Sequence, residues 1–78
     1  MTLDIKDFTE IMAEYVDLDG KEVSEGSRFI EDLGFNSYDF MSLLGELEDK
    51  YDVEVDEREV TKIRTVGEAI EYINSLGE

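Results

Sequence analysis

The sequence contains no cysteine and no histidine, and these two absences remove most of the side-chain chemistry that enzymes use. Without cysteine there is no disulfide, no thiolate metal site and no thiol nucleophile. Without histidine, a serine has no imidazole to act as its general base, so a conventional nucleophilic triad is excluded. A functional serine in this chain is therefore expected to be modified by another protein.

Positive charge is also scarce, with 7 Lys and Arg against 22 Asp and Glu and a formal net charge of −15. Such a charge repels phosphate backbones and anionic lipid surfaces, so we expect no nucleic-acid partner and no membrane partner. No segment approaches the roughly 20 apolar residues of a membrane span, and the N-terminus has neither a basic nor a long apolar stretch. We expect a soluble, cytoplasmic monomer.

The length of 78 residues leaves room for one domain, residues 1–78. A domain of this size buries only about 60% of the surface of its unfolded chain. High charge can also indicate disorder, but 41% of the residues are hydrophobic and they recur at helical spacing. We therefore expect a folded chain.

Apolar residues recur at three- and four-residue steps from Asp4 to Val16, which predicts a first amphipathic helix with Asp4 as its N-cap. Residues 17–26 lose this period and collect turn residues, which predicts a long surface loop that leads on to the next apolar residues. We expect Phe29, Ile30 and Leu33 to anchor that loop to the core.

A second helix is predicted from Ser37 to Tyr51, with Asn36 as its N-cap. At about 100° per residue, its apolar residues form one inward stripe. That stripe consists of Phe40, Leu43, Leu44, Leu47 and Tyr51. The outward face consists of Tyr38, Met41, Ser42, Gly45 and Asp49. This outward face is the natural surface for a partner.

Two capping boxes predict the remaining helices. The segment from Asp56 to Glu59 indicates a short third helix that carries Val60 and Ile63. The segment from Thr65 to Glu68 begins a last helix that stops near Gly77. The predicted fold is all-α, a four-helix bundle of three longer helices and one short third helix, with the long loop between helices one and two.

The acidic residues do not predict an active site or a metal site. Catalytic carboxylates need burial or a close partner to tune their pKa, whereas these fall mostly on polar faces and in loops. The segment Asp17-x-Asp19-Gly20 is faintly similar to a calcium loop, but its glycine is fourth where an EF-hand needs it sixth. We predict no catalytic residue and no metal ion.

Ser37, taken by itself, is a residue at a helix start. Gly34 before it suits a positive φ, so an exposed turn would hold the Ser37 hydroxyl accessible on a rigid helix end. A phosphodiester there would meet free N–H groups and the positive end of the helix dipole. Downstream, residues 46–59 are mostly acidic, which indicates either a solvated face or a surface that steers basic partners.

Three segments together resemble the acyl carrier proteins. They are Phe29-Ile30-Glu31-Asp32-Leu33-Gly34 followed by Ser37, Leu47-Glu48 with the acidic stretch, and Thr65-Val66 with Ala69-Ile70-Glu71-Tyr72-Ile73. The resemblance implies a carrier that is not an enzyme, with 4′-phosphopantetheine attached covalently to Ser37 next to Asn36. It implies that a phosphopantetheinyl transferase modifies the chain, and that the thiol holds acyl groups for fatty acid, polyketide or lipid synthesis.

The resemblance also implies residue roles. Residues that would meet basic patches on partner enzymes are Tyr38, Asp39, Met41, Glu48 and Asp49. Residues that would line an acyl pocket, and that otherwise are simply core, are Phe29, Leu47, Val55, Ile63 and Ala69. Where the family usually has an acid before the modified serine, this chain has Asn36. The alternatives are an acidic helical adaptor without a prosthetic group, or an aminoacyl or peptidyl carrier.

Overall fold

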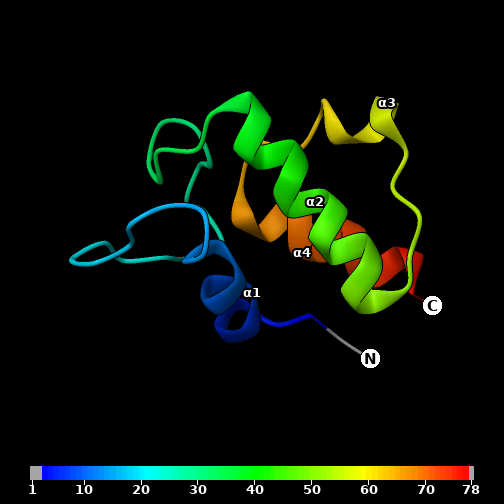
Figure 1. Cartoon of the computed structure of the whole chain (residues 1–78), viewed down its shortest axis with the longest axis horizontal. Helices are drawn as coiled ribbons and strands as arrows, with labels where there is room; N and C mark the ends of the chain where they lie inside the picture. The colour runs from blue at the N-terminus through cyan, green and yellow to red at the C-terminus, as the bar shows by residue number, and fades with distance from the viewer. Residues whose placement is uncertain (1–2, 78) are drawn as a thin grey trace.

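The computed structural model describes residues 3–77, which form four helices and no strand. The helices are α1 (Ile5–Met12), α2 (Ser37–Tyr51), α3 (Glu57–Val60) and α4 (Val66–Leu76). Figure 1 shows α2 crossing in front of α4, with the long loop between α1 and α2 on the side away from α3. The all-α prediction is confirmed. Among the described residues, no helix has both the length and the apolar character that a membrane crossing requires.

Three helices begin at the N-caps that the sequence predicts. The side chains of Asp4, Asn36 and Thr65 each accept a hydrogen bond from the backbone N–H three residues later. At Thr65 the capping box is complete, because Glu68 also accepts the Thr65 N–H at 3.1 Å. Each cap satisfies a donor that the helix itself leaves free, and so fixes where the helix begins.

The first helix is shorter than predicted, since α1 ends at Met12 and not at Val16. The backbone then tightens, and Glu14 and Tyr15 donate to the carbonyls of Ile11 and Met12, three residues back. Tyr15 and Val16 still pack against the core, so the apolar period continues through turns that are no longer an α-helix.

The third helix also differs from the prediction. The Asp56 carboxylate accepts the N–H of Arg58 at 2.8 Å, and Glu59 pairs with Lys62 at 3.7 Å. The predicted capping box between Asp56 and Glu59 is therefore wrong. The helix holds Val60 but ends before Ile63, because a single turn leaves no room for both.

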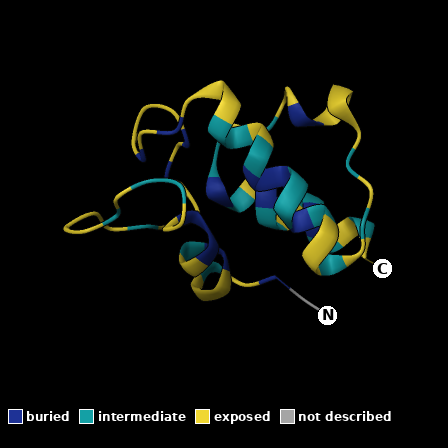
Figure 2. Cartoon of the chain, in the orientation of Figure 1, coloured by how far each residue is buried: buried dark blue, intermediate teal, exposed yellow. Residues whose placement is uncertain are grey.

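One apolar core joins the helices. The inward residues Leu43, Leu44 and Leu47 of α2 are at most 2% exposed. They share a cluster with buried residues elsewhere in the described chain, which are Leu3, Phe8, Ile11, Met12, Phe29, Leu33, Phe35, Val60, Val66, Ala69 and Ile73. Figure 2 shows buried stretches along α1, α2 and α4, whereas the loop between α1 and α2 is mostly exposed. Burial of these side chains is the main source of stability in a chain of this charge.

The loop between α1 and α2 is fastened to the start of α4 by backbone hydrogen bonds. Phe29 N–H donates to the Arg64 carbonyl at 3.1 Å, and Gly67 N–H donates to the Glu25 carbonyl at 2.8 Å. A Cβ on Gly67 would lie 3.0 Å from that same carbonyl oxygen, so glycine allows this close approach. Segments far apart in the sequence, the loop and the start of α4, are thus held together.

Of the three predicted loop anchors, Phe29 and Leu33 are buried, but Ile30 is 51% exposed. The prediction for Ile30 is wrong because the chain turns tightly here. Leu33 N–H reaches back to the Arg28 carbonyl and Phe35 N–H to the Phe29 carbonyl. The turn directs the side chains at its ends into the core and leaves Ile30 outside.

Candidate functional site

Ser37 is the first residue of α2 and is exposed. Leu33 and Phe35, just before it, are 1% and 2% exposed and hold the end of the loop against the core. Gly34 between them has φ of 83°, the left-handed conformation that glycine adopts without strain and that the sequence predicts. Buried side chains on both sides of this glycine therefore fix the point at which the chain presents the Ser37 hydroxyl.

Two backbone donors next to that hydroxyl are free. Asn36 Oδ1 accepts the Asp39 N–H at 2.7 Å. Within residues 3–77, neither the N–H groups of Ser37 and Tyr38 nor the Ser37 hydroxyl has a hydrogen-bond partner. These amides lie at the positive end of a 15-residue helix. The site therefore suits a phosphodiester on the serine, because the anion meets unused donors.

The outward face of α2 bears exposed apolar side chains next to acids. Tyr38 is 79% exposed and Met41 is 47% exposed. Asp49 is exposed as well, while Asp39 and Glu48 are half-buried. The Glu48 carboxylate accepts the Val55 N–H at 3.0 Å, so it is already engaged within the chain. Of the five predicted partner residues, three thus lie freely on the surface.

Tyr15 marks one edge of this outward face. Its hydroxyl donates to the Glu46 carboxylate at 2.7 Å and lies 3.4 Å from the Ser42 carbonyl. The hydrogen bond to Glu46, followed by partial burial, raises the pKa of Tyr15 to about 12. The neighbouring Glu46 also raises the pKa of the Glu14 carboxyl, mainly through a side-chain hydrogen bond and then through charge repulsion. Ser42 is consequently half-buried, although it was predicted on the open face.

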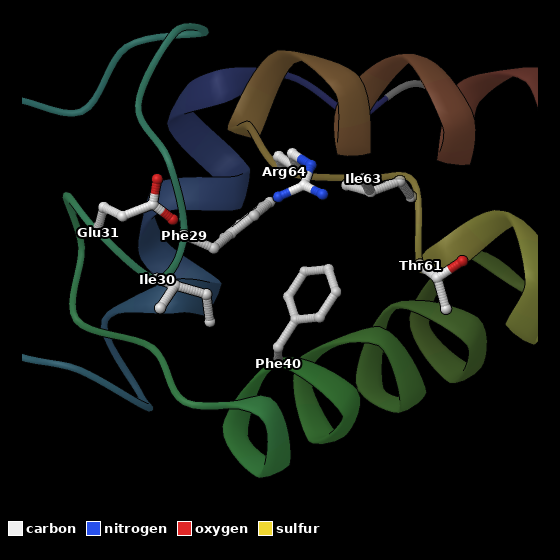
Figure 3. Close-up of a pocket in the computed structure, with 7 residues that line it drawn as sticks. All are labelled: Phe29, Ile30, Glu31, Phe40, Thr61, Ile63 and Arg64. Carbon is white, nitrogen blue, oxygen red and sulfur yellow. The ribbon is translucent and has the colours of Figure 1, made fainter.

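A cavity of about 130 Å³ lies between the loop, α2 and the segment before α4 (Figure 3). Its lining residues are Phe29, Ile30, Glu31, Phe40, Thr61, Ile63 and Arg64. Of the predicted acyl-pocket residues, Phe29 and Ile63 line this cavity. Leu47 and Ala69 are instead fully buried in the core, and Val55 is half-buried outside the cavity. No sequence signal indicated Thr61 or Arg64, because the lining joins three separate segments.

Comparison with known proteins shows which family the chain is similar to. A family model for the phosphopantetheine attachment site matches residues 6–73. The acyl carrier protein of Wolinella succinogenes is 39% identical over 69 residues, which are 88% of this chain and 91% of the relative. The acyl carrier protein of Chlamydia felis is 43% identical over 65 residues, 83% of each chain.

Solved structures agree in fold. The crystal structure of an acyl carrier protein from Thermotoga maritima matches with a TM-score of 0.80 at 33% identity, covering 92% of this chain and 84% of that one. Hexanoyl acyl carrier protein from the actinorhodin polyketide synthase of Streptomyces coelicolor matches with a TM-score of 0.82. It covers 99% of this chain and 93% of that one at 24% identity, a likeness of fold alone.

The family that matches is defined by covalent attachment of 4′-phosphopantetheine, and the match includes residues of all four helices. The free amides at the start of α2 fit that group. The chain therefore belongs to the acyl carrier protein family, whose members are not enzymes but carry acyl groups on a covalently bound 4′-phosphopantetheine.

Proposed function

We propose that Ser37 is the residue to which a phosphopantetheinyl transferase attaches 4′-phosphopantetheine. The observation that carries this proposal is an exposed hydroxyl at the start of α2, beside backbone amides without a partner in residues 3–77. The phosphodiester would form at the Ser37 oxygen. The transferase would have to take the hydroxyl proton, because no base in the described chain is hydrogen-bonded to Ser37.

The other serines are less suited to modification. Ser27 is 7% exposed, and its hydroxyl accepts the Ser24 N–H at 2.9 Å. Ser42 is half-buried in the middle of α2. Ser75 donates its hydroxyl to the Tyr72 carbonyl at 2.7 Å. Ser37 alone combines an exposed, unengaged hydroxyl with a helix N-terminus.

The loaded protein would present acyl intermediates to enzymes of fatty acid synthesis or of related polyketide or lipid synthesis in the cytoplasm, with residues 1–78 as one carrier domain. Its relatives carry the name acyl carrier protein, which supports this class of pathway. A chain of −15 also attracts partners with basic patches and speeds transient encounters with them.

The surface that partners would recognise is the outward face near Ser37. Tyr38 and Met41 supply exposed apolar area, and Asp39 and Asp49 supply negative charge beside it. An apolar contact ringed by charge gives both affinity and orientation. We include Glu48 in this surface with a smaller role, because its carboxylate already holds the Val55 amide.

Intact-mass measurement after coexpression with a broad-specificity transferase tests the attachment site. Wild type and the matched control Ser75→Ala should gain the mass of one phosphopantetheine group, and Ser37→Ala should gain nothing. Ser37→Ala should keep its fold, since Asn36 retains the cap and alanine is a good helix former. A wild type that never gains mass would indicate an adaptor without a prosthetic group. Loading of Ser37→Ala would place the attachment elsewhere.

A further inference from the structure

The side chain of Lys21 reaches from the loop between α1 and α2 to the turn that comes just before Ser37. Its ammonium group donates to the Leu33 carbonyl at 3.4 Å, and it would lie 3.7 Å from a Cβ placed on Gly34. The Leu33 carbonyl accepts no other hydrogen bond within residues 3–77. Lys21 is therefore the donor for the exposed backbone of a turn whose left-handed glycine leads the chain toward α2.

Residues 17–22, which we call the loop tip, have few other fastenings. In Figure 1 the stretch near residue 20, drawn in cyan, projects from the rest of the chain. Lys21 N–H donates to the Leu18 carbonyl at 3.0 Å and Asp19 N–H donates to the Asp17 carboxylate at 2.9 Å, so both bonds stay inside the loop tip. Within the described residues, the Lys21 ammonium makes the one hydrogen bond that joins the loop tip to a distant part of the chain.

Lysine suits this contact because its charged donor stands at the end of a long, flexible stem. Gly20 has φ of 76°, and the turn at this glycine ends at Lys21. Although acids adjoin Lys21 in the sequence, its ammonium hydrogen-bonds the Leu33 carbonyl. A hydrogen bond from a charged donor is stronger than one between neutral groups, so a single contact can restrain an exposed turn.

The turn is held from its inner side as well. Leu33 N–H donates to the Arg28 carbonyl at 3.1 Å and Phe35 N–H donates to the Phe29 carbonyl at 2.9 Å. The Leu33 and Phe35 side chains are buried. Lys21 adds a restraint from the loop tip to these contacts, and the restrained turn decides where the chain presents Ser37.

We infer that Lys21 is a positioning residue for the attachment of phosphopantetheine. It holds the Leu33 carbonyl and so keeps the turn in the conformation that presents the Ser37 hydroxyl to the transferase. The inference rests on the proposed attachment at Ser37. Without Lys21, only a fraction of the molecules presents Ser37 correctly, and the apparent affinity for the transferase falls by that fraction. Loss of Lys21 therefore raises KM for the carrier and leaves kcat unchanged.

The charge of Lys21 by itself predicts the opposite change in KM. Removing a lysine makes a chain of −15 one unit more negative, which strengthens its attraction to an enzyme with a basic patch. Lys6 is the matched control, because it is exposed in α1 and its side chain makes no hydrogen bond or ion pair within residues 3–77. The direction of the change in KM thus separates positioning from charge.

The test measures initial rates of phosphopantetheine transfer from coenzyme A by the broad-specificity transferase. The carrier concentration is varied for wild type, Lys21→Met, Lys21→Arg and Lys6→Met, and intact mass reports the loaded fraction. Hydrogen exchange of the Phe35 amide, which donates to the Phe29 carbonyl, reports the turn in the absence of the enzyme.

Lys21→Met should raise KM about threefold with unchanged kcat, the effect of losing one hydrogen bond of modest net strength. It should also speed exchange of the Phe35 amide. Lys21→Arg should restore both values, because a guanidinium can donate to the same carbonyl. Lys6→Met should load with a KM equal to or below that of wild type.

The inference is overturned if Lys21→Met has a KM at or below that of wild type, if Lys21→Arg loads no better than Lys21→Met, or if kcat falls and KM does not change. Should Lys21→Met fail to fold, Lys21→Gln against Lys6→Gln makes the same comparison, because the glutamine amide ends one atom short of the ammonium. A wild type that never loads on Ser37 would remove the proposed function together with this inference. Loading that ignores Lys21 would remove this inference alone.

Discussion

The two faces of α2 share one backbone and one set of caps, yet the side chains of one face pack in the core and those of the other are exposed to solvent. On the inward face, Leu43 and Leu47 are fully buried, whereas on the outward face Tyr38 is 79% exposed and Met41 is 47% exposed. Packing restricts the inward residues, because every methylene there contacts the core. The fold does not require large apolar residues on the outward face, so Tyr38 and Met41 are available for the partner contacts proposed above.

The sharpest contrast between the faces comes from truncation. Leu47→Ala should lower the free energy of unfolding by about 3 kcal/mol, because it leaves a cavity in the core. Met41→Ala on the outward face should change it by less than about 0.5 kcal/mol. Urea denaturation followed by circular dichroism measures both. Equal losses in the two variants would show that the outward face also supports the fold.

The sequence predicts α2 with its bounds, because Asn36 caps it and its apolar residues keep one period through Leu47. It places the end of α1 too late, because Tyr15 and Val16 continue the period through turns. The contact that fixes Tyr15, its hydrogen bond to Glu46, joins residues that are remote in sequence. A local sequence pattern cannot predict a hydrogen bond between residues that are remote in the sequence.

In the candidate site, too, the local features could be predicted from the sequence and the features built from remote segments could not. Ser37 and the positive φ at Gly34 could be predicted, because a turn and a helix start are local features. The cavity could not, because its walls come from the loop, from α2 and from residues 61–64. Ile30 was predicted to be core and is exposed at the cavity, while Arg64 had no local signal.

The boundary between the two faces can be tested at Tyr15. Tyr15→Phe removes the hydrogen bond to Glu46 and should cost about 1.5 kcal/mol. The pKa of Tyr15 is raised in the folded chain to about 12, above the usual value of about 10. The stability from this group is therefore complete below pH about 10 and is lost as pH rises through about 12.

Unfolding free energies measured across that pH range should fall less steeply in Tyr15→Phe than in wild type. The slope should not vanish, because partial burial also raises the pKa of Tyr51, which the variant retains. Tyr38→Phe, on the outward face, serves as the control for removing a phenol. A wild-type profile and a Tyr15→Phe profile that run parallel would show that the Glu46 contact does not set the edge of the outward face.

Substitution of two glycines, Gly45 on the outward face of α2 and Gly67 in α4, should change stability by a smaller amount. A Cβ added at Gly45 meets nothing within 4 Å, so Gly45→Ala should stabilise α2 by up to about 1 kcal/mol. Gly67→Ala is the matched change at the start of α4, where the Cβ would lie 3.0 Å from atoms of Glu25. It should destabilise the chain and should lower the thermal midpoint, whereas Gly45→Ala should raise it. A fall in both midpoints would mean that the outward face is more tightly packed than the structure shows.

The smallest expected change in stability is at Asn36, the residue next to the proposed attachment site. Aspartate caps a helix about as well as asparagine, so Asn36→Asp should keep the bond to the Asp39 N–H. The added charge near the positive end of α2 should contribute only a few tenths of a kcal/mol. Unfolding measurements should therefore barely distinguish this variant from wild type.

Loading rates should distinguish them. Acyl carrier proteins usually have an acid at this position, and a transferase that reads it with a basic residue gains a charge-assisted contact from Asn36→Asp. We expect faster loading of the variant at low salt and convergence with wild type at high salt, because salt screens the added attraction. Ser75→Asp adds the same charge near the C-terminal end of α4 and should load as wild type does. Slower loading of Asn36→Asp at every salt concentration would contradict this expectation and would indicate a transferase adapted to asparagine, so that the outward face of α2 would carry a recognition signal of its own.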